Sequence, residues 1–382
     1  MDFTFDDEHV ELRDLCRTFA AKEIAPYAAE WSEQHVFPTK IFKQLGELGL
    51  MGMLVNAKYG GADAGYVAYV VAMQELGGAD QSVACSWNAH STIASLPLAR
   101  FGTDEQKERW LRPLAEGTHI GAFGLTEPTA GSDASGIRTR ARRDAGGWLI
   151  NGNKMFITNA GTDMSLGVTI LAVTSEPGEP KRFGTFFIPK DTEGYSMGAP
   201  LQKLGWNASD TRELVFEDCW IPDDHLIGDE GNGLRQFLEV LDPGRISVAA
   251  LSLSLADAAL RLAVRHATDR EQFGRPIHQF QAVSHKIADM ATEVEAARWM
   301  VFRAAWLADV GLPFGQAAAM AKLYASEVAN RAASASLQVH GGYGWMRESE
   351  ISRFYSDAKI LEIGEGTNEI QRTVIARSVM GS

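Results

Sequence analysis

The sequence is poor in cysteine, has no excess of basic residues and contains no long apolar run. Its three cysteines, Cys16, Cys85 and Cys219, lie far apart in a chain of 382 residues. An odd number of scattered cysteines argues against a disulfide framework and favours a reducing compartment. No apolar run approaches the ~20 residues that a membrane helix needs. The acidic N-terminus also lacks the basic and apolar regions of a signal peptide. We therefore expect a cytoplasmic protein that does not span a membrane.

The formal net charge is −13, from 36 basic and 49 acidic residues. A nucleic-acid-binding surface needs a basic patch, and this sequence offers none, so no nucleic-acid partner is expected. An anionic ligand would have to be held by a few placed arginines and by backbone N–H groups, because no general positive field is available.

Several common binding motifs are missing. The sequence has no Gly-x-Gly-x-x-Gly after a strand, no Gly-x-x-x-x-Gly-Lys loop, no His-Glu-x-x-His and no Cys-x-x-Cys pair. These absences disfavour a Rossmann dinucleotide site, nucleotide hydrolysis and a structural zinc site. The histidines show no ligand spacing either, so no metal is expected.

The sequence does contain a clear change of period along the chain. Residues 1–118 have helical spacing, with Asp6 or Asp7 as the first N-cap and breaks at 60–62 and 77–78. Residues 119–231 contain short β-type runs, with hairpin turns expected at 144–147 and 151–153. Residues 232–382 return to long helical segments.

This order predicts three domains: an N-terminal helical domain over 1–118, a middle antiparallel β-barrel or sandwich over 119–231, and a C-terminal helical bundle over 232–382. The length supports more than one domain, because a single hydrophobic core stops growing well below this size.

Near the C-terminus, Gly364-Glu365-Gly366 separates two segments with apolar spacing. The two glycines permit backbone conformations that are closed to other residues and allow a ligand to approach closely. Asn368 with Gln371 has the pattern of an N-cap and its capping-box partner, so a helix is expected to begin there. Taken alone, the segment is more typical of a loop with a solvated glutamate.

Four other segments are unusual, although each alone is also compatible with an ordinary loop, strand or helix connection. Residues 125–133 form a strand-to-loop segment rich in hydroxyls, and the spacing of Phe156 and Thr158 puts both on one strand face. Residues 269–276 place arginines, an aromatic ring and a glycine between two long helices. A helix ends in glycines over 338–345. These compositions suit a flat ring and a diphosphate.

Taken in order, these five segments make the chain similar to the FAD-dependent acyl-CoA dehydrogenases over essentially its whole length. Members of that family enclose FAD and an acyl chain between a helical domain, a β-domain and a four-helix bundle. The resemblance implies oxidation of an acyl-CoA thioester to the trans-2-enoyl-CoA, with electrons passed to electron-transfer flavoprotein. It also implies a cofactor held between subunits, and hence an oligomer, typically a homotetramer.

By resemblance, Glu365 is the base that removes the α-proton while a hydride leaves the β-carbon for flavin N5. Burial in a dry acyl pocket would raise the pKa of this glutamate, as a base requires. The residues expected to contact FAD, some of them on a neighbouring subunit, are Leu125, Thr126, Ser132, Phe156, Thr158, Arg270, Phe273, Gln281, Gln338, Gly341, Gly342, Thr367 and Glu369. Those expected near the acyl-CoA are Ser132, Asp242, Arg245, Gly364 and Gly366.

The chain departs from the family pattern at informative positions. Some members carry the base just before the arginine that corresponds to Arg245, but Gly244 stands there, so no second carboxylate competes with Glu365. Phe156 replaces a tryptophan that is usual in the family, which reduces the stacking area. Gly364 replaces a tyrosine common in straight-chain members, which favours a branched or bulky acyl group as one hypothesis.

By the same resemblance, the helix that contains residues 86–92 is expected to line the acyl pocket, so its sequence bears on the substrate. Residues 81–97 contain no Arg or Lys, which disfavours a dicarboxylyl-CoA substrate. Trp87 would shorten the pocket, unless it is a core residue. Two rival functions remain open: an acyl-CoA oxidase that uses oxygen, and a non-catalytic acyl-CoA-binding protein. The presence of Glu365 and of the FAD segments favours the dehydrogenase, with a short- or branched-chain substrate.

Overall fold

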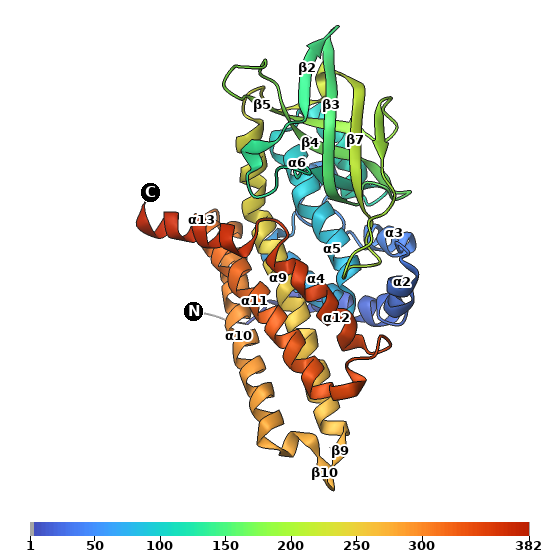
Figure 1. Ribbon diagram of the computed structural model, residues 1–382, viewed down its shortest axis with the longest axis vertical. Coiled ribbons are helices and arrows are strands. Elements are labelled where there is room, and N and C mark those ends of the chain that lie inside the picture. Colours follow the sequence, from blue (N-terminus) through green and yellow to red (C-terminus); the bar gives the residue numbers. More distant parts are fainter. Residues whose placement is uncertain (1–3, 382) are drawn as a thin grey trace.

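A computed structural model describes residues 4–381 of the protein. Residues 1–3, part of the segment that argued against a signal peptide, lie outside the described residues. The molecule is elongated, with a β-sheet at one end, the C-terminal helices at the other and the N-terminal helices beside them (Figure 1). The predicted order of helical, β and helical regions is therefore confirmed.

The N-terminal region is helical, as its spacing predicts. Asp6 caps the first helix by accepting a hydrogen bond from the His9 backbone, and Thr103 forms a capping box with Gln106. Short π-helical turns follow at Ala20–Ile24, His90–Ala94 and Lys107–Leu111. The α-helices are α1 (Asp7–Phe19), α2 (Ala28–Gln34), α3 (Thr39–Glu47), α4 (Gly65–Ala79), α5 (Gln81–Ala89), α6 (Ser95–Phe101), α7 (Asp104–Gln106) and α8 (Arg112–Ala115).

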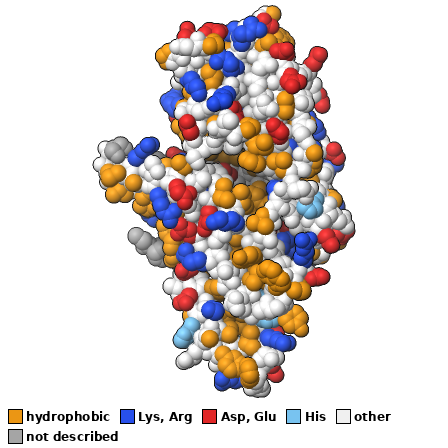
Figure 2. All heavy atoms as spheres, in the orientation of Figure 1, with side chains coloured by type: hydrophobic (Ala, Val, Ile, Leu, Met, Phe, Trp, Pro, Cys, Tyr) orange, Lys and Arg blue, Asp and Glu red, His pale blue; other side chains and the backbone are white. Residues whose placement is uncertain are grey.

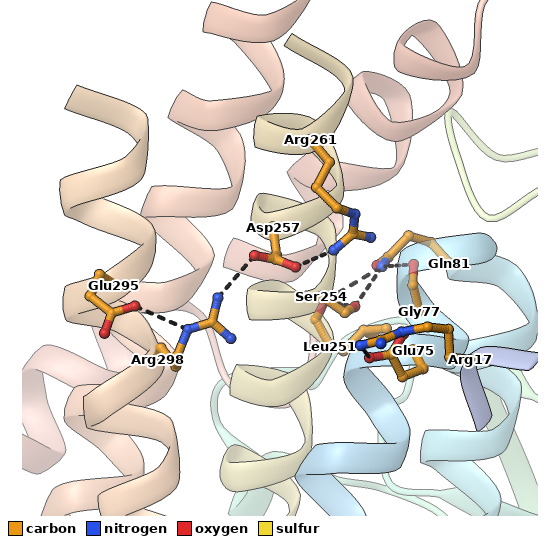
Figure 3. A network of polar contacts seen from close by, with 10 residues as sticks. All are labelled: Arg17, Glu75, Gly77, Gln81, Leu251, Ser254, Asp257, Arg261, Glu295 and Arg298. Carbon is orange, nitrogen blue, oxygen red and sulfur yellow. Dashed lines mark hydrogen bonds and ion pairs between the residues drawn. The ribbon is translucent and has the colours of Figure 1, made fainter. Parts of the chain in front are cut away.

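The predicted break at 77–78 is wrong, because both glycines lie inside α4. A side chain at Gly77 would collide with Ser254 of the long helix α9 (Gly233–Asp269), and one at Gly78 would lie 2.8 Å from Arg261. Gln81 fixes this contact by donating to Ser254 Oγ at 2.9 Å (Figure 3). The glycines therefore permit close helix packing and do not end the helix.

The middle region is one mixed sheet. Its strands are β1 (Ile120–Gly124), β2 (Arg140–Asp144), β3 (Gly147–Thr158), β4 (Ser165–Val173), β5 (Phe183–Pro189), β6 (Tyr195–Met197), β7 (Thr211–Pro222) and β8 (Leu226–Ile227). The order is β6-β7-β3-β2-β4-β5-β8, with β1 beside β4. The prediction of a purely antiparallel domain is wrong, because β1 runs parallel to β4 and Arg140 of β2 pairs with Val173 in the parallel sense.

The two predicted hairpin turns have different outcomes. The turn at 144–147 joins β2 to β3, with Ala145 and Gly146 at positive φ, as a tight hairpin requires. The turn at 151–153 is wrong, because these residues continue β3 through an irregularity in its pairing with β7. Gly152 suits this position, since a side chain there would lie 2.6 Å from Thr139 Oγ1.

The C-terminal region is a helical bundle. It contains α9, α10 (Gln281–Asp309), α11 (Gly315–His340), α12 (Glu350–Ala358) and α13 (Asn368–Met380). A two-stranded arm, β9 (Glu271–Gln272) and β10 (Arg275–Pro276), links α9 to α10 at the far tip of the molecule (Figure 1). One apolar core spans the N-terminal and C-terminal helices, from Cys16 to Leu361.

Contrary to the sequence prediction, one helix in the described chain is long and apolar enough to cross a membrane. This helix is α9, but 83% of its most apolar window is buried inside the protein. It lies between α4, α10 and α11, so its apolar character reflects a central position in the core. Basic, acidic and apolar side chains are mixed over the face seen in Figure 2, with apolar groups gathered toward the arm.

Candidate active site

The segment Gly364-Glu365-Gly366 forms a tight loop between the 3₁₀ turn Lys359–Glu362 and α13. Glu365 and Gly366 have φ values of +51° and +93°. A left-handed glutamate costs about 1–3 kcal/mol of backbone strain and persists only where its surroundings hold it. The surrounding protein therefore holds this loop in one conformation.

The cap of α13 differs from the prediction by one residue. Thr367 is the N-cap and accepts from the backbone N–H of Ile370. Asn368 instead points inward, because its side-chain oxygen accepts hydrogen bonds from Lys322 Nζ at 3.0 Å and Ser326 Oγ at 3.1 Å. The short polar side chain is thus used to anchor the loop to α11.

Lys322 is the main support of the loop. Its side chain is fully buried in α11 and donates to the Gly366 carbonyl at 2.9 Å as well as to Asn368. Burial lowers the pKa of Lys322 to about 8, although nearby Glu365 opposes this. Gln371 Nε2 also donates to the Gly366 carbonyl, at 3.0 Å. The sequence analysis missed Lys322; a lone lysine in the alanine-rich run of α11 was the available signal.

The Glu365 carboxylate points into the protein between α5 and α9. Its Oε1 accepts from Asn88 Nδ2 at 2.9 Å, and its Oε2 is buried with no hydrogen-bond partner in the described chain. Burial raises the pKa of Glu365 to about 7, while the Asn88 hydrogen bond and the charges of Lys322 and Arg245 oppose the rise. A buried carboxylate with one unused oxygen and a near-neutral pKa is suited to accept a proton.

The part of α9 around Gly244 lies against this carboxylate. A side chain at Gly244 would collide with Glu365 Oε2 and lie 3.2 Å from Ile93 Cγ2, so glycine is needed here for the glutamate to fit. Arg245 is buried, forms an ion pair with Asp242 and keeps its Nε buried without a partner. The structure thus brings Gly244 and the charge of Arg245 to Glu365, with Asp242 paired to Arg245.

The predicted residues of the β-domain lie in the segment after β1 and in β3. The carbonyl of Thr126 accepts from the Met155 backbone at 2.8 Å, which joins the segment after β1 to β3. The Phe156 ring is 66% exposed beside an irregularity in β3, with Ile157 buried and Thr158 half-buried. An outward-facing ring on a fixed strand is available for stacking on a flat ligand.

The predicted residues of segments 269–276 and 338–345 lie at the β9–β10 arm and at the end of α11. Phe273 is 93% exposed at the tip of the β9–β10 arm, and Arg270 lies 5.5 Å from the Tyr343 ring, which places the arm against the glycine turn after α11. A side chain at Gly341 or Gly342 would meet no atom within 4 Å, so this turn is open to a ligand. In Figure 1 the arm is at the tip, whereas the loop before α13 is near the middle.

The predicted site residues therefore fall into three groups within one chain. The group around Glu365 includes Gly364, Gly366, Thr367 and the exposed Glu369. The β-domain group is Leu125, Thr126, Ser132, Phe156 and Thr158, and the group around the arm is Arg270, Phe273, Gln281, Gln338, Gly341 and Gly342. These residues fit a cofactor with a flat ring and a diphosphate, such as FAD. Phe156 and Phe273 are exposed and available for stacking, the buried Nε of Arg245 has no partner in the described chain, and the turn at 341–342 is open to a ligand. No group of three or more His, Cys, Asp or Glu side chains that could hold a metal occurs among residues 4–381.

Comparison with known proteins gives the same assignment along the whole chain. Residues 6–118, 122–219 and 231–380 match the N-terminal, middle and C-terminal domains of acyl-CoA dehydrogenases. The chain is 45% identical over 381 residues, 100% of both sequences, to a probable acyl-CoA dehydrogenase of Bacillus subtilis. It is 40% identical to the mitochondrial short-chain specific acyl-CoA dehydrogenase of Rattus norvegicus, over 98% of this chain and 91% of that protein. An acryloyl-CoA reductase (NADH) of Anaerotignum propionicum is 42% identical over 100% of this chain and 96% of its own length.

Solved structures agree with these relatives. Butyryl-CoA dehydrogenase from Megasphaera elsdenii superposes with a TM-score of 0.96 at 39% identity, covering 100% of both chains. A chain from a structure of the electron transferring flavoprotein of Acidaminococcus fermentans gives the same TM-score, identity and coverage. An acyl-CoA dehydrogenase of Bacillus anthracis complexed with FAD superposes at 0.93 with 32% identity, over 99% of this chain and 68% of its own. This chain therefore belongs to the acyl-CoA dehydrogenase family of FAD-dependent oxidoreductases.

Proposed function

We propose that this enzyme removes hydrogen from the α- and β-carbons of a short acyl-CoA thioester, with Glu365 as the base. The observation that carries the proposal is the Glu365 carboxylate, which is buried on a strained loop with one oxygen held and the other without a partner in the described chain. The pKa of about 7 lies where a general base is most effective at neutral pH.

Bound FAD supplies the acceptor for the hydride that leaves the β-carbon. Oε2 of Glu365 takes the α-proton, since Oε1 is occupied by Asn88. The backbone N–H of Glu365 stabilises the developing enolate oxygen, as the donor of an oxyanion hole does. Arg245 and Asp242 contribute to holding the acyl-CoA beside the loop, and the buried Nε of Arg245 has an unused hydrogen for a polar group of the ligand.

The interior beyond Asn88 favours a short acyl chain. Trp87 and Tyr69 are fully buried and stacked at 4.6 Å between ring centroids, and Trp87 Nε1 donates to the Leu50 carbonyl. Trp87 is thus a core residue that also fills space a long chain would need. The short-chain relative from rat and the butyryl-CoA dehydrogenase structure support the same substrate class.

Branching of the acyl group is a second variable. A side chain at Gly364 would meet only the Ile360 carbonyl, at 3.5 Å, so the space beside Glu365 is open on this side. This opening supports a substrate with a substituent near the α- or β-carbon. Short straight and short branched acyl groups are therefore the two substrates to compare.

We further propose electron-transfer flavoprotein as the electron acceptor and a homotetramer as the assembly. The match to a chain in the electron transferring flavoprotein structure supports the first proposal. The β-domain group and the arm group lie apart within one chain, which supports the second proposal, since the exposed Phe273 and the glycine turn at 341–342 would then serve a neighbouring subunit's cofactor. The relative named as an acryloyl-CoA reductase supports one further candidate, saturation of an enoyl-CoA by the reverse reaction.

The purified yellow protein tests the function directly. Anaerobic addition of butyryl-CoA is expected to bleach the oxidised flavin absorbance near-completely, because the thioester delivers two electrons to FAD. A panel of butyryl-, isobutyryl-, octanoyl- and glutaryl-CoA then ranks chain length and branching, with octanoyl- and glutaryl-CoA expected to bleach least. No bleaching by any of these would contradict the proposed function, and stoichiometric peroxide during aerobic turnover would indicate the oxidase instead.

The fit of Glu365 against Gly244 gives a sharp mutational test. Gly244→Ala is expected to lower kcat/KM by about 100-fold, because its methyl group displaces the carboxylate from the position that reaches the α-carbon. Gly198→Ala is the matched control, since its methyl group would meet Glu213 Cβ at an ordinary 3.6 Å. Unchanged kcat/KM in the Gly244 variant would contradict the placement of Glu365.

A further inference from the structure

The Glu365 carboxylate is held through a single side chain from another part of the protein. Asn88, on α5 and 277 positions away in sequence, donates from Nδ2 to Glu365 Oε1 at 2.9 Å. The charged groups of Lys322 on α11 and Arg245 on α9 influence the carboxylate electrostatically, but neither is hydrogen-bonded to it. Asn88 is thus the group that fixes where the two carboxylate oxygens lie.

The orientation of the Asn88 amide is itself fixed. Its Oδ1 accepts from the Tyr69 hydroxyl at 3.1 Å, so Nδ2 is the atom turned toward Glu365. A flipped amide would place Oδ1 against the Glu365 carboxylate, and the hydrogen bond between them would be lost in a buried site where unpaired polar groups are costly. Stacking on Trp87 holds Tyr69, and the Thr92 hydroxyl donates to the Asn88 backbone carbonyl at 2.7 Å.

We propose that Asn88, oriented by Tyr69, is a positioning residue that holds Glu365 by Oε1 so that Oε2 faces the α-carbon of the substrate. This inference rests on the proposed function of Glu365. An amide N–H can donate to Oε1 whether the glutamate is a carboxylate or a carboxylic acid with its proton on Oε2. The same hydrogen bond therefore survives proton transfer, and the loop keeps its geometry before and after the step.

The contact also favours the ionised form of Glu365 against the effect of burial. A donor stabilises the ionised form, so Asn88 opposes the effect of burial on the pKa of Glu365. The ionisable groups around the carboxylate are Lys322 on α11, Arg245 on α9, Tyr69 on α4 and Cys85 on α5. Burial raises the pKa values of the Tyr69 hydroxyl and the Cys85 thiol well above their ordinary values, so neither ionises in the range where Glu365 titrates.

The test replaces the amide by an apolar side chain of similar size. In the holoenzyme, Asn88→Leu is expected to move the acid limb of kcat/KM to higher pH by about one unit, which lowers kcat/KM about tenfold at pH 6. The carboxyl ¹³C titration of Glu365, identified by its absence in Glu365→Gln, is expected to move in the same direction. Tyr69→Phe keeps Asn88 but frees its amide, so a smaller shift of the same sign is expected.

Ser252→Ala is the matched control, because it removes a buried hydroxyl from α9 that donates to the Val248 carbonyl at 2.7 Å and leaves Tyr69, Asn88 and Thr92 in place. It is expected to lower thermal stability without moving the titration of Glu365. Unchanged Glu365 titration in both Asn88→Leu and Tyr69→Phe would overturn the proposal, and if Asn88→Leu fails to fold, Tyr69→Phe decides alone. Full activity of Glu365→Gln would instead overturn the proposed function, so the two failures are distinguishable.

Discussion

Glu365→Gln is expected to lower turnover by at least about 10³-fold, while FAD stays bound. General-base catalysis contributes about 10²–10⁴-fold in enzymes, and a glutamine has the shape of glutamate but cannot take a proton. Its side-chain oxygen can still accept from Asn88, so the loop is expected to keep its conformation. Stopped-flow measurement of flavin reduction by butyryl-CoA, together with the flavin-to-protein absorbance ratio, checks both parts.

The same base predicts the pH dependence of the wild-type enzyme. Only ionised Glu365 accepts a proton, and burial raises its pKa to about 7. The value of kcat/KM should therefore be low in acid and rise through about pH 7 to a plateau.

Glu362→Gln is the control for Glu365→Gln, because Glu362 precedes the loop and pairs with Lys359 at the surface. Retained flavin reduction in Glu365→Gln would show that another group is the base.

Lys154→Met is expected to lower the stability of the β-domain by about 3–5 kcal/mol and to weaken FAD binding. Lys154 and Glu127 form a buried ion pair at 2.9 Å, with side chains 0% and 4% exposed. Removing one partner of such a pair leaves an unpaired buried charge. Glu127 also accepts from the Arg138 and Thr139 backbones, at 2.6 Å and 3.0 Å, and Lys154 donates to the Leu125 carbonyl at 3.2 Å.

This network is the reason why we expect Lys154→Met to weaken FAD binding. Burial alone would raise the pKa of Glu127, but Lys154 and the backbone donors outweigh it and the pKa is lowered, so the ionised pair is the stable form. Without Lys154, the segment that carries Leu125 and Thr126 loses its side-chain anchor to β3 and is held there by the Met155 backbone hydrogen bond. Thermal unfolding and FAD titration of the variant measure the two effects.

A surface pair serves as the comparison. Glu179→Ala removes the partner of Arg182, in a pair whose side chains are more than half exposed, and it should change stability by less than about 1 kcal/mol. The double variant Glu127→Leu/Lys154→Met is expected to recover part of the lost stability, because no unpaired charge is left. Equal stability of Lys154→Met and wild type would contradict a structural role for the pair.

Local patterns in the sequence predicted many elements correctly. Asp6 was one of the two residues expected to cap the first helix, and the turn at 144–147 was predicted from its composition. The failures have one cause, which is contact with distant residues. Glycine stands at 77, inside α4, because Ser254 of α9 leaves no room for a side chain. The residues at 151–153 stay in β3 because β7 pairs with them through an irregularity.

The site was only partly predictable. Glu365 was identified because its flanking glycines occur in register with four other segments, although the loop alone gave no decisive signal. Asn88 and Lys322 act on Glu365 from α5 and α11, at sequence separations that no local pattern connects. Asn368 was taken for a cap from its residue type, but burial against Lys322 gave its side chain a different role.

The sequence by itself determined the order of helical, β and helical regions and the family, and it singled out Glu365 as the proposed base, because these depend on residue types and their spacing. Only the tertiary structure decided how Glu365 is made reactive. Burial, the single donor from Asn88, the lysine beneath the loop and the missing side chain at Gly244 are all properties of residues that folding brings together. They fix which carboxylate oxygen is free and raise its pKa to about 7.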